Sequence, residues 1–243
     1  MIHGTHVLKV LIVIPAYNEE KNLITLLPEI IKHCACADIL LVDDGSTDRT
    51  SQIAGLYDIP VIQLDNSGIG GAMQAGFLYA IDHGYDVAVQ IDADGQHDPL
   101  WVKQLLKPIV DDRADCTIGS RYMKHNPDRS YKTPILRRIG IYYSSVLLFL
   151  VTGIYISDTT SGFRALNANV LEFFRTNYPA KYPEAGALLM LTLAGFRIAE
   201  VRIKMRNRKA GHSMYTFSRS VFYPFHVVIG FIEIYLKTRR KEK

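Results

Sequence analysis

Short apolar runs alternate with stretches of helical spacing along the first half of the chain. The apolar runs predict strands at residues 7–14, 38–42, 61–63, 86–91 and 116–119. Apolar residues that recur every three or four positions predict helices at residues 22–33, 49–57, 72–83 and 99–111. Strands that alternate with helices in this way are typical of a mostly parallel sheet with helices on both faces. The predicted fold class is therefore α/β.

The second half of the chain is less regular. Its pattern predicts an apolar helix at 139–153, a loop at 157–164, a helix at 184–195 and a strand at 197–203, then a basic turn at 204–212. No internal repeat interrupts the sequence. The second half is therefore expected to add to the same α/β core.

Polar residues follow three of the predicted strands. They are Pro15–Glu19, Asp43–Ser46 and Asp92–Asp94. In parallel α/β sheets, ligands bind beyond the carboxyl ends of the strands. The three clusters are therefore expected to meet at one edge of the sheet and to form the functional site.

Asp92 and Asp94 place two carboxylates around a single residue. Like charges this close repel each other unless a proton or a cation lies between them. Oxygen ligands suit Mg²⁺ or Mn²⁺, which would also take the phosphate oxygens of a diphosphate. With Gln96 nearby, the pattern predicts a metal site, and the alternative is an ordinary acidic loop.

Two further segments could contact phosphates. Gly68, Gly70 and Gly71 precede a predicted helix, where backbone N–H groups can bind a phosphate or can simply form a tight turn. Basic residues alternate from Arg202 to Lys209, where they could clamp phosphates or protect an edge strand from pairing.

The charges divide the chain into two halves. Residues 1–121 carry eight Lys or Arg and 17 Asp or Glu, whereas residues 122–243 carry 20 and seven. The basic half is expected to meet something anionic, although solvated faces that differ in charge are the simpler alternative. Nucleic acid is not the expected partner, because the front half is acidic and no nucleic-acid-binding motif is present.

Two apolar segments bear on the location of the protein. Residues 139–157 contain no charge but several Gly, Ser and Thr residues, and residues 221–236 precede a basic end. An amphipathic helix with a basic end typically lies on an anionic bilayer, and the alternative for both segments is a core helix. Three cysteines are typical of a reducing compartment. The expected location is cytoplasmic, at the cytoplasmic face of the membrane.

These clusters, in this order, resemble the family 2 glycosyltransferases, and among them the synthases that attach mannose or glucose to dolichyl or polyprenyl phosphate. The matching stretches are residues 13–19, 42–48, 68–72, 90–97, 119–121 and 161–164, with Arg208, Gly211 and Ser213. The resemblance covers nearly the whole chain.

The resemblance implies a GT-A fold and a role for each matching residue. The domain would span residues 1–216, with a donor side at 1–121, an acceptor side at 122–216 and an apolar, basic-ended segment at 217–243. The donor side would consist of Pro15, Ala16, Tyr17, Glu19, Val42, Asp43, Asp44, Asp92, Ala93, Asp94, Arg121 and Arg208. The metal ligands would be Asp92, Asp94 and Gln96, and the acceptor side would include Ser161, Gly162, Phe163 and Arg164.

The chain departs from the family pattern in three places. Arg202 stands where relatives often have proline, and Met214 stands where a lysine commonly follows Gly-x-Ser. Gly186 replaces the second member of an acidic pair near Glu184. Because Met214 replaces that lysine, one phosphate contact is missing or comes from Lys209.

The resemblance predicts transfer of a sugar from a GDP- or UDP-sugar, with inversion at the sugar, assisted by Asp94, Arg208 and a divalent cation. A lipid-phosphate acceptor is already anionic and needs no strong base. A hydroxyl of a glycan would need one, for which Glu184 is the candidate. A nucleotide-sugar-binding module without catalysis is a third hypothesis.

Overall fold

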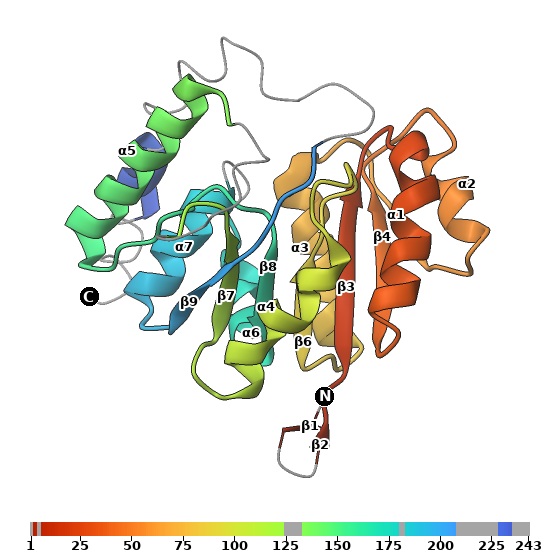
Figure 1. Cartoon of the computed structure of the whole chain (residues 1–243), viewed down its shortest axis with the longest axis horizontal. Helices are drawn as coiled ribbons and strands as arrows, with labels where there is room; N and C mark the ends of the chain where they lie inside the picture. Colours follow the sequence, from red (N-terminus) through yellow and green to blue (C-terminus); the bar gives the residue numbers. More distant parts are fainter. Residues whose placement is uncertain (1, 4–5, 124–132, 180–182, 208–227, 235–243) are drawn as a thin grey trace.

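The computed structural model describes the chain except residues 1, 4–5, 124–132, 180–182, 208–227 and 235–243 (Figure 1). A seven-stranded sheet crosses the molecule in the order β5–β4–β3–β6–β8–β7–β9. The strands are β3 (Val10–Ala16), β4 (Ala37–Asp43), β5 (Val61–Gln63), β6 (Val87–Gln90), β7 (Cys116–Ser120), β8 (Arg164–Asn167) and β9 (Ile198–Arg202). Only β8 runs antiparallel to its neighbours in this sheet, so the sheet is mostly parallel, as predicted.

Helices cover both faces of the sheet, because each central strand is apolar on both sides. The helices are α1 (Glu20–His33), α2 (Thr50–Gly55), α3 (Gly68–Asp82), α4 (Val102–Val110), α5 (Ile135–Thr152), α6 (Ala168–Asn177) and α7 (Pro183–Leu193), with a 3₁₀ turn at Pro99–Trp101. Helices α1, α2 and α4 share one hydrophobic core with Ile12 and Ile14 of β3. Helices α3, α6 and α7 share the other core with Leu11 and Val13. The alternation of β3 residues between the cores explains why the strand reads as one apolar run.

The predicted first strand divides into two elements. Residues His6–Val7 form β2, which pairs with β1 (Ile2–His3) in a separate hairpin, and β3 begins only at Val10. The backbone N–H of Lys9 donates to the side chain of Asp86 instead of continuing the strand.

The sequence pattern missed β8 and α6. Strand β8 lies between β6 and β7, so the acidic and basic halves of the chain share one sheet. Helix α6 follows at once, where the side chain of Asn167 accepts a hydrogen bond from the backbone N–H of Val170. This cap and the apolar residues Val170, Leu171 and Phe174 were the available signals.

Residues 228–234 are also helical, and they are the described part of the apolar terminal segment. Phe231 is buried in the core with α3 and α7, whereas Ile229 and Ile232 are exposed. Within the described ranges, no helix is long and apolar enough to span a bilayer.

Helix α3 lies so close to β3 that only glycine fits at position 76. A Cβ at Gly76 would lie 2.3 Å from Cγ1 of Val13. We therefore expect Gly76→Ala to lower the free energy of unfolding by about 1–3 kcal/mol, measured by chemical denaturation. Gly55→Ala is the matched control in α2, where a Cβ would meet nothing within 4 Å, and it should not destabilise the protein. Equal stabilities of the two variants would contradict this packing constraint.

Candidate active site

The first two polar clusters meet at the carboxyl edge of the sheet. Pro15 and Ala16 lie in β3 beside Val42 and Asp43 of β4. The backbone N–H of Asp44 donates to the carbonyl of Ala16 over 2.9 Å. Tyr17 is exposed just beyond the strand, and Glu19 is half-buried before α1. The expected meeting of these clusters is confirmed.

Asp43 fixes the shape of the loop that follows β4. Its Oδ1 accepts from the backbone N–H of Ser46 at 2.9 Å, and its Oδ2 accepts from the hydroxyl of Ser51. Ser46 in turn accepts from the backbone N–H of Asn18 at 2.9 Å. The loops after β3 and β4 are therefore held together as one surface.

Asp44 caps helix α3 from outside the helix. Its carboxylate accepts from the backbone N–H of Ser67 at 2.6 Å, the hydroxyl of Ser67 at 2.8 Å and the backbone N–H of Gly68 at 2.7 Å. The two backbone donors are N–H groups of the kind that a helix start leaves without an intrahelical partner, and a negative charge is favourable there. The glycine-rich stretch thus begins the helix directly at Gly68, where φ is +75°.

Val42 is completely buried in the core against α3. Its side chain therefore faces the hydrophobic interior, whereas the neighbouring Tyr17 and Glu19 border the solvent. The residues expected on the donor side thus include both supporting and solvent-facing members.

Asp92 and Asp94 follow β6 and differ in exposure. Asp94 and the intervening Ala93 are buried, and Oδ1 of Asp94 accepts from the backbone N–H of Gln96 at 3.0 Å. The side chain of Asp92 is 36% exposed. Its Oδ1 accepts from Nε2 of Gln90 at 3.0 Å. Asp92 therefore presents a carboxylate oriented by a neighbour but open to solvent.

His97 is a buried residue that contacts both the backbone and the side chain of Asp92. The backbone N–H of Asp92 donates to Nδ1 of His97 at 3.1 Å, so the ring nitrogen on that side carries no proton. Nε2 of His97 lies 3.7 Å from Oδ2 of Asp92, and the ring stacks on Phe163 with centroids 4.9 Å apart. His97 is 1% exposed, so it acts as a support and not as a solvent-facing ligand.

The backbone of the loop at 161–164 lies close to the carboxylate of Asp92. A Cβ at Gly162 would lie 2.8 Å from Oδ2 and 2.9 Å from Oδ1 of Asp92. Only a glycine can let the backbone come this close to the carboxylate. The metal-site cluster and the predicted acceptor loop are therefore in direct contact.

The oxygen atoms of Asp92 and Asp94 suit a divalent cation whose remaining ligands come from a bound substrate. No group of three or more His, Cys, Asp or Glu side chains suited to a metal occurs in the described part of the chain. Mg²⁺ is commonly held by one or two carboxylates together with substrate phosphates. Asp92 and Asp94 supply such a pair, whereas Nε2 of Gln96 donates to the carbonyl of Arg206 at 3.4 Å.

The other residues of the predicted acceptor loop, Ser161, Phe163 and Arg164, hold this loop against the sheet. Ser161 donates through its hydroxyl to the carbonyl of Gly119 at 2.7 Å, and Phe163 is fully buried. Arg164 donates to the carbonyls of Ser161 at 2.8 Å and Thr159 at 3.2 Å. These side chains therefore shape the loop from beneath.

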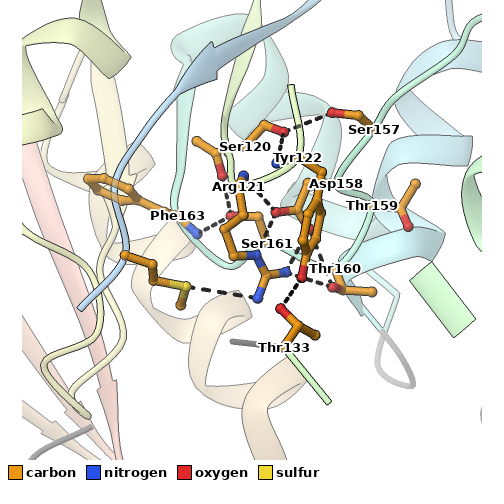
Figure 2. A network of polar contacts seen from close by, with 12 residues as sticks. Ser120, Arg121, Tyr122, Thr133, Ser157, Asp158, Thr159, Thr160, Ser161 and Phe163 are labelled. Carbon is orange, nitrogen blue, oxygen red and sulfur yellow. Dashed lines mark hydrogen bonds and ion pairs between the residues drawn. The ribbon is translucent and has the colours of Figure 1, made fainter. Parts of the chain in front are cut away.

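Arg121 forms a buried, two-pronged ion pair with Asp158 (Figure 2). Its Nε and Nη2 each lie 2.6 Å from a carboxylate oxygen, and its backbone N–H donates to Asp158 at 3.1 Å. Nη2 also donates to Thr160 at 3.0 Å. Arg121 therefore ties the end of β7 to the segment 157–161, and its contact with a substrate phosphate stays a prediction.

Glu200 anchors the same segment from β9. It accepts from the backbone N–H of Ser157 at 2.9 Å, the hydroxyl of Ser157 at 2.7 Å and the backbone N–H of Asp158 at 3.1 Å. Ser157 also shares a hydroxyl contact of 2.8 Å with Ser120. Segment 157–161 is thus held from both β7 and β9.

Glu184 lies in the first turn of α7. Burial raises the pKa of its carboxyl, the negative charge of Asp92 adds to this, and the positive charges of Arg164 and Arg137 oppose it. The candidate base Glu184 is therefore within electrostatic reach of Asp92. A raised pKa makes a carboxylate a stronger base than an ordinary surface carboxylate.

The start of the basic turn packs against the segment from Gln96 to Asp98. The backbone N–H of Arg206 donates to the carbonyl of Gln96 at 2.9 Å, and its side chain pairs with Glu29 and, at 2.8 Å, with Asp98. Arg206 is therefore used to fix the turn. Arg208, the predicted phosphate ligand, lies outside the described residues.

Several supporting residues were not assigned from the sequence. His97 was visible within the matching stretch at 90–97 but was given no role. Asp158 was visible only as an acid within the predicted loop at 157–164. Glu200 gave no signal, because a single acid in a strand is normally a solvent-facing residue. Each of these residues acts through contacts between segments far apart in the sequence.

Known proteins place this arrangement in a family. Residues 11–174 match the family described as Glycosyl transferase family 2. The chain belongs to glycosyl transferase family 2. The resemblance noted from the motifs is thereby confirmed, and the protein is a glycosyltransferase.

Similar family 2 proteins cover most of the chain. The UDP-N-acetylglucosamine–dolichyl-phosphate N-acetylglucosaminyltransferase of Methanococcus voltae is 32% identical over 213 residues, which cover 79% of this chain and 84% of that protein. The polyprenol monophosphomannose synthase of Mycolicibacterium smegmatis is 34% identical over 220 residues, which cover 84% and 80%.

A solved structure has the same GT-A fold. The glucosyl-3-phosphoglycerate synthase of Mycobacterium tuberculosis, in complex with Mn²⁺, UDP and phosphoglyceric acid, has a TM-score of 0.72 at 18% identity. The similarity covers 93% of this chain and 78% of that one. The predicted GT-A architecture of this glycosyltransferase is thus confirmed.

The contact between Gly162 and Asp92 leads to a prediction for activity. Gly162→Ala would push the carboxylate of Asp92, a predicted metal ligand, aside. We therefore expect sugar transfer to fall by about 10- to 100-fold, the usual effect of losing a group that orients a metal ligand. The measurement is the initial rate of transfer, with the thermal midpoint recorded alongside. Gly55→Ala serves as the control and should retain activity. A fully active Gly162→Ala enzyme would mean that the close approach is unimportant.

Proposed function

We propose that this enzyme transfers a sugar from a nucleotide-diphosphate-sugar to a polyprenyl phosphate such as undecaprenyl or dolichyl phosphate. The observation that carries the proposal is the similarity over about four-fifths of the chain to transferases named for such acceptors. An undecaprenyl-phosphate mannosyltransferase of Micrococcus luteus is also 31% identical over 216 residues. The single GT-A domain at 1–216 is part of the same proposal.

The donor would bind at the carboxyl edge of β3, β4 and β6. Tyr17 and Glu19 would border the nucleoside of a UDP- or GDP-sugar, and the loop fixed by Asp43 and Asp44 would support it from the β4 side. Arg121 and Arg208 would contact phosphates. The relative from Methanococcus voltae is named for a UDP-sugar, which supports uridine over guanosine.

Asp92 and Asp94 would hold Mg²⁺ or Mn²⁺, with Gln96 nearby. When bound, the cation neutralises charge on the diphosphate that leaves. The Mn²⁺ and UDP named for the Mycobacterium tuberculosis structure support this assignment. Gln90, His97 and Gly162 would keep the Asp92 carboxylate in place for that role.

The chemical step would be an in-line displacement. An oxygen of the acceptor phosphate attacks the anomeric carbon, a bond forms there, and the bond to the diphosphate breaks with inversion. The nucleoside diphosphate leaves with the electron pair. The phosphate oxygen is already anionic at neutral pH, so no side chain has to remove a proton. The loop from Ser161 to Arg164 would shape the acceptor side.

A specific observation supports a second candidate acceptor, a hydroxyl of a cell-wall, surface or lipid-linked glycan. Glu184 has a raised pKa and is in electrostatic reach of Asp92, as a general base would be. The family membership argues against the remaining hypothesis, a binding module without catalysis.

The proposed location is cytoplasmic, at the cytoplasmic face of a membrane. A long polyprenyl chain keeps the acceptor in the bilayer, so the enzyme must work at its surface. The basic second half of the chain would favour an anionic surface.

The metal assignment predicts the effect of one substitution. Asp94→Asn removes a charged ligand, and we expect the transfer rate to fall on the order of 100-fold or more and to require more Mn²⁺. The measurement is formation of lipid-extractable labelled sugar during a Mn²⁺ titration, with EDTA as the metal-free point. Asp58→Asn is the control, because Asp58 is exposed and its φ of 54° suits asparagine. Full-rate transfer by Asp94→Asn in EDTA would exclude the metal site.

Glu184→Gln distinguishes the two acceptors. A general base contributes about 10²- to 10⁴-fold, so a loss of that size would identify a hydroxyl acceptor. With undecaprenyl phosphate we expect a loss of less than about tenfold, because its oxygen is already anionic. The measurement is kcat for each acceptor, and Glu172→Gln on the exposed side of α6 is the control.

A further inference from the structure

The chain that follows β9 lies across the loop that follows β6. We call residues 94–98 the metal loop, because this loop contains two of the three predicted metal ligands. After β9 the chain runs towards α1 and forms an antiparallel bridge between Met205 and His97 (Figure 1). The backbone N–H of Arg206 donates to the carbonyl of Gln96 at 2.9 Å. This segment is therefore attached to the metal loop through its backbone.

Hydrogen bonds hold both the backbone and the side chain of Gln96. Its backbone N–H donates to Oδ1 of Asp94 at 3.0 Å, and its carbonyl accepts from Arg206. Its side-chain Nε2 donates to the carbonyl of Arg206 at 3.4 Å, a long hydrogen bond. A carbonyl can only accept, so the amide turns its NH₂ group towards Arg206. The amide oxygen of Gln96, which is the atom that can ligate a cation, is therefore turned away from this carbonyl.

The side chain of Arg206 anchors the segment at two points. Its Nη2 lies 2.8 Å from Oδ1 of Asp98 at the end of the metal loop, and its Nη1 pairs with Glu29 on α1. Asp98 also accepts from the backbone N–H of Leu100 at 3.0 Å, at the start of the 3₁₀ turn. The side chain of Arg206 is 31% exposed and that of Asp98 is 16% exposed, so water and salt screen this pair only in part. The guanidinium therefore joins the metal loop to a regular helix.

The metal loop depends on such anchors because it is neither strand nor helix. Gly95 has a φ of +73° there, a conformation that glycine adopts without strain. A glycine also has more backbone freedom to lose than any other residue when a loop becomes ordered. Contacts from outside the loop must therefore restrict the orientation of Gln96.

We propose that Arg206 is a positioning residue for the predicted metal ligand Gln96. Its ion pairs with Asp98 and Glu29 hold the segment after β9 across the metal loop. Its backbone groups then keep the amide oxygen of Gln96 available to a divalent cation. Arg206 acts through Gln96 and needs no contact with the cation. The inference rests on the metal site of the proposed function.

Mn²⁺ binding by the full-length chain in the presence of UDP tests the proposal. Free Mn²⁺ is measured by electron paramagnetic resonance, which requires no sugar transfer. Loss of a group that orients a metal ligand weakens metal binding by about 10- to 100-fold, so we expect Arg206→Met to raise the Mn²⁺ dissociation constant about tenfold. Arg206→Lys should raise it less, because an ammonium keeps the charge but not the planar fork that meets two carboxylates.

The matched control is Arg175→Met on α6. Arg175 also pairs with two carboxylates, Asp82 at 3.2 Å and Glu172 at 2.9 Å, and its side chain is 39% exposed. We expect this variant to bind Mn²⁺ within about twofold of the wild type, as is usual for a surface substitution. Circular dichroism and the thermal midpoint establish that each variant is folded.

A double-mutant cycle tests whether Arg206 acts through Gln96. Gln96→Ala removes the amide oxygen and should itself weaken Mn²⁺ binding. In that background Arg206→Met should cause no further loss, because the group that it positions is already absent. Equal losses in both backgrounds would mean that Arg206 has only a general structural role, and the proposal would be wrong. If Arg206→Met does not fold, Glu29→Gln takes its place in the same cycle, with a smaller expected loss.

Failure of the proposed function has a different outcome. If the wild-type chain binds no Mn²⁺ in the presence of UDP, the metal assignment is wrong and this proposal fails with it. If the wild type binds Mn²⁺ and Arg206→Met binds it equally well, this proposal alone is overturned. Transfer to a glycan hydroxyl instead of a polyprenyl phosphate would leave the expected Mn²⁺ affinities unchanged.

Discussion

The buried ion pair between Arg121 and Asp158 is the interaction on which the acceptor side depends. Two charges are removed from water there, and this is tolerated only because the guanidinium and carboxylate meet through two parallel hydrogen bonds. Glu200 adds three more hydrogen bonds to the same segment. The chain that leaves this clamp reaches Gly162, whose backbone contacts Asp92. The surroundings of the Asp92 carboxylate are thus set from the neighbouring strands.

The acidic residues of the first half do different work despite similar sequence surroundings. Asp43 and Asp44 accept hydrogen bonds that fix a loop and begin helix α3. Asp92 is also oriented by a neighbour, but it keeps an exposed carboxylate. A cation near Asp92 would therefore not have to displace a structural hydrogen bond of the β4 loop. Asp43 and Asp44 therefore stabilise the loops around the candidate site, whereas Asp92 keeps a carboxylate open to solvent.

Helix α5 contacts segment 157–161 on one face and is exposed on the other. Its inner face is joined to the clamped segment through a pair of hydroxyls, whereas its outer face offers apolar side chains to whatever lies outside.

The sequence alone determined the α/β fold, the three polar clusters at one sheet edge and the family, because strand periodicity and local motifs are properties of neighbouring residues. It missed β8, which pairs with β6 and β7, and α6, which packs against α3, because their partners lie far away in the sequence. It could not assign roles to His97, Asp158 or Glu200, and it could not separate the supporting Asp44 from the open Asp92. Those distinctions depend on contacts between segments distant in the chain, and only the tertiary structure brings them together.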